Sequence, residues 1–222
     1  MNINCAVDKS KYKKDRVILH SDCNGFYASV ECLHHPEIRN KPVAVSGDAE
    51  NRHGIILAKN EIAKKYNIKT GEAIWQAKQK CPDLITVPPH FDLYKRFSKM
   101  ARRIYSEYTD KIEPFGLDEA WLDVTDNKDM SGKEIALEIN CRIKQELGIT
   151  VSIGVSFNKI FAKFGSDYKK PDAITEITRE NYRDIVWNCP AKDLLYVGRA
   201  TGRKLESIAV SYTHLTLPTS DL

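Results

Sequence analysis

Three carboxylate side chains, Asp22, Asp118 and Glu119, stand at positions from which they could act together. Asp22 ends an apolar run typical of a buried strand, whereas Asp118 and Glu119 lie between two strand-like runs, at the tip of a predicted hairpin. Converging carboxylates repel one another unless cations neutralise them, and Mg²⁺ prefers such hard oxygen ligands. Two magnesium ions held there would suit in-line transfer of a phosphoryl group. The alternative is that these are ordinary acidic residues at a strand end and a turn.

The elements that position these acids alternate between strands and helices. Without a small inserted lobe, the predicted order is β, then α-β-β-α-β, then further helices and strands, which fits a ferredoxin-like α/β (α+β) core: an antiparallel sheet backed by two helices. The core strands are predicted at 17–22, 111–115, 120–124, 151–155 and 173–177, and the core helices at 92–108, 131–147 and 158–169. The lobe contains predicted helices at 26–33, 60–65 and 74–80 and strands at 42–46 and 55–58, and the tandem Pro88-Pro89 predicts its end.

The composition is typical of a soluble globular protein. Of the 222 residues, 42% are hydrophobic and 29% are charged, and no apolar run approaches the roughly 20 residues that span a bilayer. The formal net charge of +4 permits a nucleic-acid partner but does not require one. The six cysteines show no paired spacing, so neither a zinc site nor a disulfide framework is predicted. The charged N-terminal residues lack the apolar stretch of a signal peptide, and we expect a cytoplasmic protein.

Four segments carry motifs that occur together in one family. They are HSDCNGFYASVE (20–31), IILAKNEIAKKYNIKTGE (55–72), FGLDEAWLDV (115–124) and SFNKIFAKFGSDYKKP (156–171). In type and order, these segments resemble the motifs of the Y-family DNA polymerases, the translesion enzymes of the DinB/UmuC type. The resemblance implies template-directed addition of deoxynucleotides to a primer 3′-hydroxyl, assisted by two Mg²⁺ ions.

The resemblance also implies a division of the chain into domains. A catalytic palm would consist of 1–25 and 90–177, with a fingers insertion at 26–89 and a partial helical thumb at 178–208. Residues 209–222 do not resemble the continuation of the thumb, so we expect a non-native or divergent tail in a chain truncated before the little-finger domain. The implied partners are primer–template DNA, deoxynucleoside triphosphates and, through the region beyond this chain, a sliding clamp; we expect a monomer without a membrane partner.

The family's metal and sugar contacts can be transferred to residues of this chain. Asp22 and Asp118 would bridge both metal ions, and Glu119 would complete the site near the primer 3′-hydroxyl. The backbone carbonyl of Cys23 would be a further metal ligand. Phe26 and Tyr27 would lie beneath the sugar of the incoming nucleotide, with Tyr27 as the steric gate that excludes a ribose 2′-hydroxyl. For Tyr27 the alternative is plain helix packing.

The triphosphate contacts match the family less well. Lys170, in the Lys-Lys-Pro run, corresponds to a lysine that contacts the triphosphate. In the fingers, the usual tyrosine and arginine are replaced by Glu61 and Lys64. Lys64 keeps the positive charge but loses the bidentate fork, whereas Glu61 would oppose a phosphate. A shift of one residue would bring Asn60 to the site instead.

Further residues are candidates for contacts with DNA or the nascent base pair. Lys159 and Lys163 could face DNA phosphates or be merely solvated. Gly198 and Gly202 lie near a turn that resembles the phosphate-binding helix-hairpin-helix of the thumb. The segment 54–58 would form the roof over the nascent base pair, or an ordinary buried strand.

Because ferredoxin-like palms serve several functions, two other classes stay open. A metal-dependent nucleotide cyclase would act on nucleotide alone, without primer or template. A non-catalytic DNA-binding fragment would bind primer–template and ignore Mg²⁺.

Overall fold

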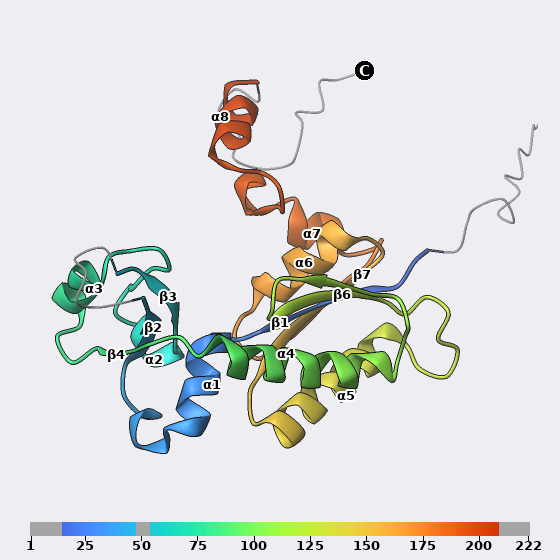
Figure 1. The fold of residues 1–222 in the computed structure, drawn as a ribbon. Helices are drawn as coiled ribbons and strands as arrows, with labels where there is room; N and C mark the ends of the chain where they lie inside the picture. Colours follow the sequence, from blue (N-terminus) through green and yellow to red (C-terminus); the bar gives the residue numbers. More distant parts are fainter. Residues whose placement is uncertain (1–14, 48–53, 209–222) are drawn as a thin grey trace, which may run out of the picture.

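The computed structural model describes residues 15–47 and 54–208, which form two β-sheets surrounded by helices (Figure 1). The larger sheet has the strand order β5-β6-β1-β7-β8. Its central strand, β1 (Ile18–Cys23), runs antiparallel to both of its neighbours. The other four strands are β5 (Ile112–Phe115), β6 (Glu119–Asp123), β7 (Val151–Ser156) and β8 (Ile174–Ile177).

Helices cover both faces of the larger sheet. Helices α4 (Phe91–Ser106) and α5 (Gly132–Arg142) lie on one face, and α6 (Lys159–Tyr168) lies on the other (Figure 1). Successive strand residues point to opposite faces. Leu19 accordingly belongs to the main core with α4 and α5, whereas Ile18 packs with Ala162 of α6.

This arrangement confirms the predicted ferredoxin-like core. The order β1-α4-β5-β6-α5-β7 gives four antiparallel strands, with the two connecting helices on the same face. The strand predicted at 173–177 is also present, and it extends the sheet because α6 returns the chain so that β8 pairs parallel to β7. The predicted antiparallel sheet is therefore extended by a β-α-β unit that places α6 over the strands carrying the acids.

The smaller sheet forms a separate lobe with the strand order β3-β2-β4. A core of its own, which includes Ala44, Ile56 and Leu84, packs between this sheet and its helices. The three-residue strand β4 was not predicted, because it is too short for a periodic pattern. The elements are β2 (Val43–Ser46), β3 (Ile56–Lys59), β4 (Ile85–Val87), α2 (Glu61–Lys64) and α3 (Ile74–Lys80).

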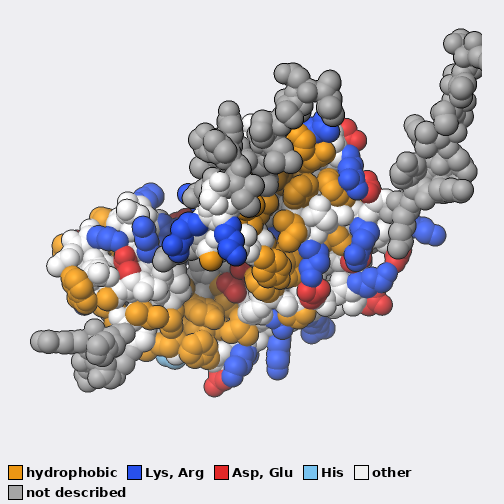
Figure 2. All heavy atoms as spheres, turned by 90° about the horizontal axis from the view of Figure 1, so that it is seen from above, with side chains coloured by type: hydrophobic (Ala, Val, Ile, Leu, Met, Phe, Trp, Pro, Cys, Tyr) orange, Lys and Arg blue, Asp and Glu red, His pale blue; other side chains and the backbone are white. Residues whose placement is uncertain are grey.

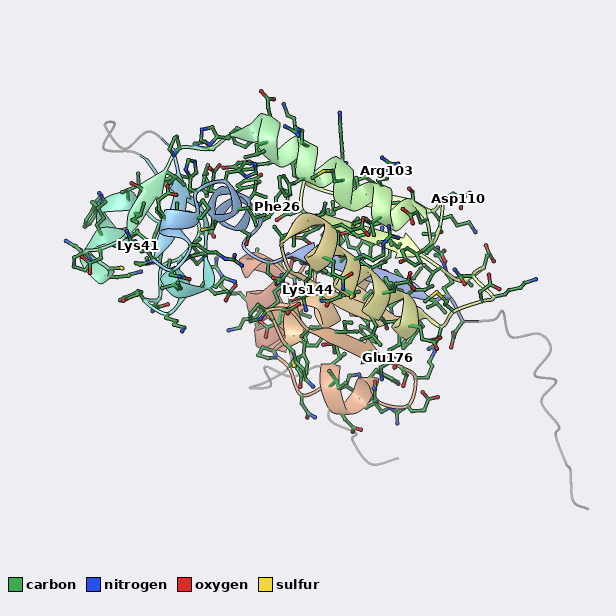
Figure 3. All side chains as sticks on the ribbon, turned by 90° about the horizontal axis from the view of Figure 1, so that it is seen from below. Phe26, Lys41, Arg103, Asp110, Lys144 and Glu176 are labelled. Atoms are coloured by element: carbon green, nitrogen blue, oxygen red, sulfur yellow. The ribbon has the colours of Figure 1, made fainter. Side chains whose placement is uncertain are left out.

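Helix α1 (Phe26–His34) joins the two parts of the molecule. Phe26 and Val30 pack into the core of the larger sheet, so α1 is not confined to the inserted lobe. Figure 3 shows Phe26 where α1 meets α4. A 3-10 turn, η2 (Pro36–Ile38), follows.

The helix predicted at 131–147 changes geometry near its end. Ser131 caps α5 by accepting from the backbone N–H of Glu134, whose carboxylate accepts from the backbone N–H of Ser131 at 2.8 Å. This reciprocal capping box confirms the predicted start. After Arg142 the chain continues as one π-helical segment, η3 (Ile143–Leu147), which ends at Gly148 with a φ of 69°.

The described chain ends in short helices, of which α7 (Tyr182–Val186) lies beside α6 whereas α8 (Arg199–Ile208) lies farther from the sheet (Figure 1). A 3-10 turn, η4 (Ala191–Asp193), comes between them in the chain. The tail predicted at 209–222 lies outside the described residues. Within the described ranges, no helix combines the length and apolar character required to cross a bilayer.

Candidate active site

The structure brings the three predicted acids together where β1 ends and β6 begins. Asp22 and Glu119 are direct partners across the β1–β6 pair, and both face α6. Asp118 immediately precedes β6, and its backbone carbonyl accepts a 3.0 Å hydrogen bond from the N–H of Cys23. The Cys23 thiol is buried in the main core, and this burial raises its pKa. The negative charges of Asp118 and Asp22 add to this effect, so the thiol stays protonated and is a poor metal ligand.

The acids differ in their affinity for protons. Burial raises the pKa of Asp118 to about 6, and the negative charges of Asp22 and Glu119 add to this effect. Burial alone would also raise the pKa of Glu119, but contacts with His20 and Lys163 lower it to about 2. At neutral pH Glu119 is ionised. Ionisation of Asp118 is unfavourable in this environment, and a nearby cation would make it more favourable.

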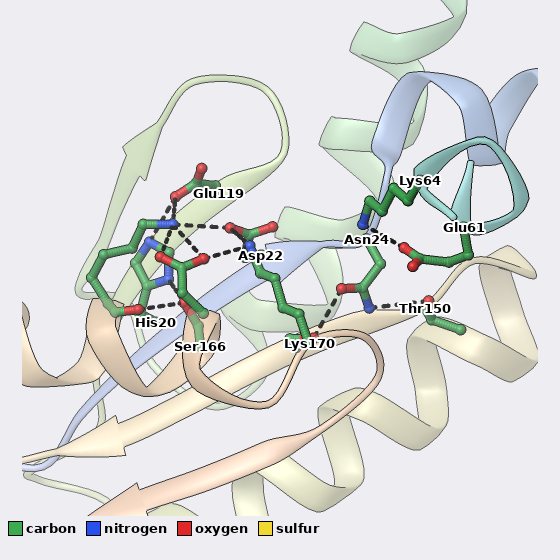
Figure 4. A network of polar contacts seen from close by, with 12 residues as sticks. His20, Asp22, Asn24, Glu61, Lys64, Glu119, Thr150, Ser166 and Lys170 are labelled. Atoms are coloured by element: carbon green, nitrogen blue, oxygen red, sulfur yellow. Dashed lines mark hydrogen bonds and ion pairs between the residues drawn. The ribbon is translucent and has the colours of Figure 1, made fainter. Parts of the chain in front are cut away.

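Two ammonium groups enter this cluster from α6 and the turn that follows it (Figure 4). The Nζ atom of Lys163 lies 3.0 Å from Asp22 Oδ2 and 2.7 Å from Glu119 Oε2. The Nζ atom of Lys170 lies 2.6 Å from the same Asp22 oxygen. Asp167 contacts both lysines, at 3.2 Å from Lys163 and 2.6 Å from Lys170. The cluster thus contains its own counter-charges.

We predicted that Lys163 either faces DNA phosphates or is solvated, and the structure places its side chain elsewhere. Its side chain is only 13% exposed and is directed into the acid cluster, not towards solvent or a DNA-facing surface. The reason is that α6 packs unusually close to the sheet. A Cβ atom at Gly154 of β7 would lie 1.9 Å from the carbonyl oxygen of Ala162, and the Cα atom of Gly154 is 3.1 Å from a Cβ built at Gly165. Two facing glycines therefore bring the lysines of α6 within reach of the strands.

The residues present fit Mg²⁺, although the side chains are arranged around lysines. Among the described residues, no three His, Cys, Asp or Glu side chains are grouped as a metal cluster. Within the same ranges, the buried Oε2 atom of Glu119 has no well-aligned hydrogen-bond partner. This oxygen and the carboxylates of Asp22 and Asp118 are ligands of the hard kind that Mg²⁺ prefers.

An aromatic wall stands on α1 and α4 near the acids. Tyr27 stacks on Tyr94 with a centroid distance of 4.3 Å and an interplanar angle of 11°. The hydroxyl of Tyr94 donates to the buried carboxylate of Glu31. Burial raises the pKa of Tyr27, and the charge of Asp118 adds to the effect, which places the phenol near the acid cluster. Phe26 is 2% exposed and packs against both tyrosines, so its ring supports the wall and does not form its surface.

Comparison with known proteins decides the family. Residues 21–167 match the model of the impB/mucB/samB family. The chain belongs to this family. A DNA polymerase IV from Acetivibrio thermocellus is 59% identical over 197 residues, which cover 88% of this chain and 49% of that protein. DNA polymerase IV 1 from Bacillus subtilis is 42% identical over 198 residues, which cover 89% of this chain and 48% of that protein.

Solved structures agree with this family membership. DinB from Sulfolobus solfataricus superimposes with a TM-score of 0.79 at 31% identity, over 86% of this chain and 57% of that one. An insertion ternary complex of Dbh DNA polymerase gives a TM-score of 0.80 at 30% identity, over 86% and 57% of the two chains. The resemblance to Y-family polymerases is confirmed, and the chain spans about half the length of the curated relatives it matches.

The residues of this chain at and next to the fingers positions that the resemblance assigns to triphosphate binding are hydrogen-bonded or ion-paired within the protein. Asn60 caps α2: its Oδ1 atom accepts from the N–H groups of Ala63 and Val43, and its Nδ2 atom donates to the carbonyl of Lys41. These contacts occupy Oδ1 and one of the two N–H groups of Nδ2. The contact of Asn60 with a triphosphate stays a prediction. Glu61 pairs with Lys64 at 2.5 Å. The acidic residue is therefore neutralised by the lysine that replaces the family arginine.

The other residues predicted to contact DNA lie in two different parts of the structure, at the start of α6 and around α8. Lys159 lies 4.4 Å from the ring centroid of Trp121 and pairs with Glu113 at 2.5 Å, at the exposed end of α6. Gly198 directly precedes α8. Gly202 is inside α8, and its N–H donates to the carbonyl of Gly198. Contacts of these two glycines with DNA stay predictions. Figure 2, viewed from the side of α6 and α7, shows basic side chains spread among apolar and acidic ones over its coloured part.

Several residues of the site were not singled out from the sequence. His20 and Ser166 form a buried chain of contacts to Glu119, and Asp167 links the two lysines. The spacing contained a usable signal for two of them. His20 lies two residues before Asp22 and so must share its face of β1. Asp167 follows Lys163 by four residues on α6 and precedes Lys170, in the turn after the helix, by three, which predicts that Asp167 can reach both lysines.

Proposed function

We propose that this chain is the catalytic part of a template-directed DNA polymerase of the translesion type. The observation that carries the proposal is the joint placement of Asp22, Asp118 and Glu119 beside Lys170, with the Tyr27 wall next to them. Curated relatives named DNA polymerase IV and the ternary complex of Dbh DNA polymerase support it. The partners proposed for the chain are primer–template DNA and deoxynucleoside triphosphates.

The presence of two sheets, each with its own core, supports a division into domains. We assign the palm to 1–25 and 90–177 and the fingers to 26–89, with α1 packing on both. The partial thumb is assigned to 178–208. A sliding-clamp contact, a monomeric state and a cytoplasmic location stay predictions.

Each group of the site has a task in the proposed reaction. Asp22, Asp118 and Glu119 would hold two Mg²⁺ ions, with the Cys23 carbonyl as a further ligand. Bound there, Mg²⁺ supplies activation of the primer hydroxyl and stabilisation of the leaving pyrophosphate. Lys170, whose ammonium can leave Asp22 when other cations neutralise that acid, binds the triphosphate as a point charge.

Substrate selection would depend on the aromatic wall. Tyr27 limits the space beside the sugar, and Tyr94 holds its ring in place by stacking. A ribose 2′-hydroxyl would collide with a ring that cannot rotate away. Lys64 remains a candidate for the triphosphate once Glu61 releases it.

Primer extension on a recessed primer–template, with Mg²⁺ and each deoxynucleotide, tests the proposal. We compare the chain with the double variant Asp118→Asn, Glu119→Gln and with Asp129→Asn, an exposed control. Extension that is lost only in the double variant supports a polymerase built on these acids. Product formed from nucleotide without primer would indicate a cyclase, and DNA binding indifferent to Mg²⁺ and to the double variant would indicate a non-catalytic fragment.

A further inference from the structure

A histidine that the proposed reaction does not use lies against the acid cluster. His20 belongs to β1, two residues before Asp22, and its side chain is completely buried. Its ring meets the edge of Trp121 at a centroid distance of 4.9 Å and an angle of 65°. The Nε2 atom lies 3.1 Å from Glu119 Oε2, and the Nδ1 atom lies 2.8 Å from the hydroxyl of Ser166 (Figure 4).

The protons of this chain of contacts can be assigned from its chemistry. A neutral imidazole carries one N–H and can donate from only one of its two ring nitrogens. An ionised Glu119 can only accept, which places that N–H on Nε2. Nδ1 is then an acceptor and faces the hydroxyl of Ser166. The Ser166 hydroxyl has a single proton, and both Nδ1 and the backbone carbonyl of Lys163 lie 2.8 Å from its oxygen. With the N–H on Nε2, that proton is donated to Nδ1.

The three residues come from three different elements. Glu119 lies on β6, His20 on β1 and Ser166 on α6. His20 thus connects the carboxylate to the helix that also carries Lys163. The contact between Nε2 and Oε2 is close but poorly aligned: within the described chain, neither atom has a well-directed hydrogen bond. A small rotation of the Glu119 carboxylate would align it.

We propose that His20, oriented by Ser166, is a positioning residue that sets the rotation of the Glu119 carboxylate in the acid site. This proposal rests on the polymerase function proposed above, because it assigns Glu119 a task near the primer hydroxyl. A carboxylate at the start of a strand has free side-chain torsions, and Lys163 alone cannot fix them because its contact is shared with Asp22 and Asp167. The imidazole on the neighbouring strand lies 3.1 Å from the same oxygen, and it would supply a second contact once the carboxylate has rotated.

The test compares four variants. His20→Phe keeps an aromatic ring against Trp121 but removes the donor, and His20→Gln replaces the donor with an amide. Ser166→Ala removes only the group that orients the ring. Ser156→Ala is the matched control, since Ser156 is equally buried but donates to the carbonyl of Ile177, away from the acids.

Two readouts separate positioning from packing. The first is the binding of Mn²⁺, followed by the EPR signal of the free ion, because Mn²⁺ prefers the same oxygen donors as Mg²⁺. The second is primer extension, analysed as kcat and as KM for the nucleotide. For His20→Phe we expect Mn²⁺ affinity and kcat to fall about 10–100-fold, as is typical for residues that orient metal ligands, with KM nearly unchanged. His20→Gln should recover part of the loss, Ser166→Ala should shift both readouts in the same direction, and Ser156→Ala should match the unmodified chain.

The proposal is overturned if His20→Phe and Ser166→Ala bind Mn²⁺ as tightly as the unmodified chain. It is also overturned if His20→Gln is no better than His20→Phe, because the donor would then be irrelevant. Thermal unfolding identifies a variant that fails to fold, in which case Ser166→Ala decides. If the unmodified chain binds Mn²⁺ but extends no primer, the polymerase function fails, and the Mn²⁺ readout still decides the role of His20.

Discussion

The close packing of α6 on the sheet leads to a sharp prediction for Gly154→Ala. The added methyl group would lie 1.9 Å from the carbonyl oxygen of Ala162 and 2.5 Å from the backbone nitrogen of Ser166. Ordinary contact begins at 3.4 Å. The difference between 3.4 and 1.9 Å requires α6 to move by about 1.5 Å, because the obstructing atoms are backbone and cannot rotate away.

Such a displacement has a cost in stability and in activity. Overpacking of this kind costs about 1–3 kcal/mol, and at about 2–4 °C for each kcal/mol in a chain of this size the Tm falls by roughly 2–12 °C. The same movement carries Lys163 away from Asp22 and Glu119. A misplacement of about 1 Å at a catalytic group can cost about 100-fold in rate, so primer extension should suffer more than stability does.

Thermal unfolding and primer extension on three variants check this reasoning. Gly165→Ala is milder, since its methyl group meets Gly154 Cα at 3.1 Å and the carbonyl oxygen of Thr175 at 3.2 Å. Gly47→Ala is the control, because its methyl group meets nothing within 4 Å. The expected order of damage is Gly154, then Gly165, then Gly47. A Gly154→Ala protein that melts and extends primers like the Gly47→Ala control would refute the close approach of α6.

Three further predictions concern individual side chains. Asp118→Asn should stabilise the metal-free protein above about pH 6, by at most about 3 kcal/mol, and not below about pH 4. The pKa of Asp118 is about 6 in the folded protein, raised from 3.8, so ionisation of this carboxyl lowers the free energy of unfolding as the pH rises from about 4 to 6. Asparagine cannot ionise and avoids this loss, which thermal unfolding measured against pH would show. Asn60→Ala should cost about 1–2 kcal/mol in urea unfolding through loss of the α2 cap. Lys170→Met should raise the KM for nucleotide roughly 10-fold or more in steady-state primer extension, because a charged hydrogen bond to phosphate is lost.

The convergence of the acids could be predicted from the sequence because it depends on local signals. A buried strand ending in Asp22 and a hairpin with an acidic tip are both visible as residue patterns, and the ferredoxin-like order then makes them neighbours. Helix starts were equally readable. Ser131 caps α5, and Asn158 caps α6 by accepting from the N–H of Phe161 at 2.8 Å.

The remaining features depend on distances between elements, which residue patterns do not contain. From the helical pattern alone, the side chain of Lys163 could equally well be exposed to solvent. It reaches the acids because Gly154 and Gly165 let α6 pack close to the sheet. The role of Asn60 as a cap also depends on contacts between elements that are distant in the sequence. Its side chain is occupied by Lys41 and Val43, which precede it by nearly twenty residues along the chain and reach it through the smaller sheet.

The central position of β1 has a consequence for the order of folding. Ile18 pairs with Asp123 on one side and with Ser156 on the other, so the first strand of the chain cannot complete its ladder until the later strands have been synthesised. Contacts between residues so distant in sequence close slowly, and an unpaired apolar strand is prone to aggregation while it waits. A nascent chain that stops before β7 would expose one edge of β1. Productive expression of this protein should therefore be sensitive to the pace of translation and to chaperones that cover strand edges.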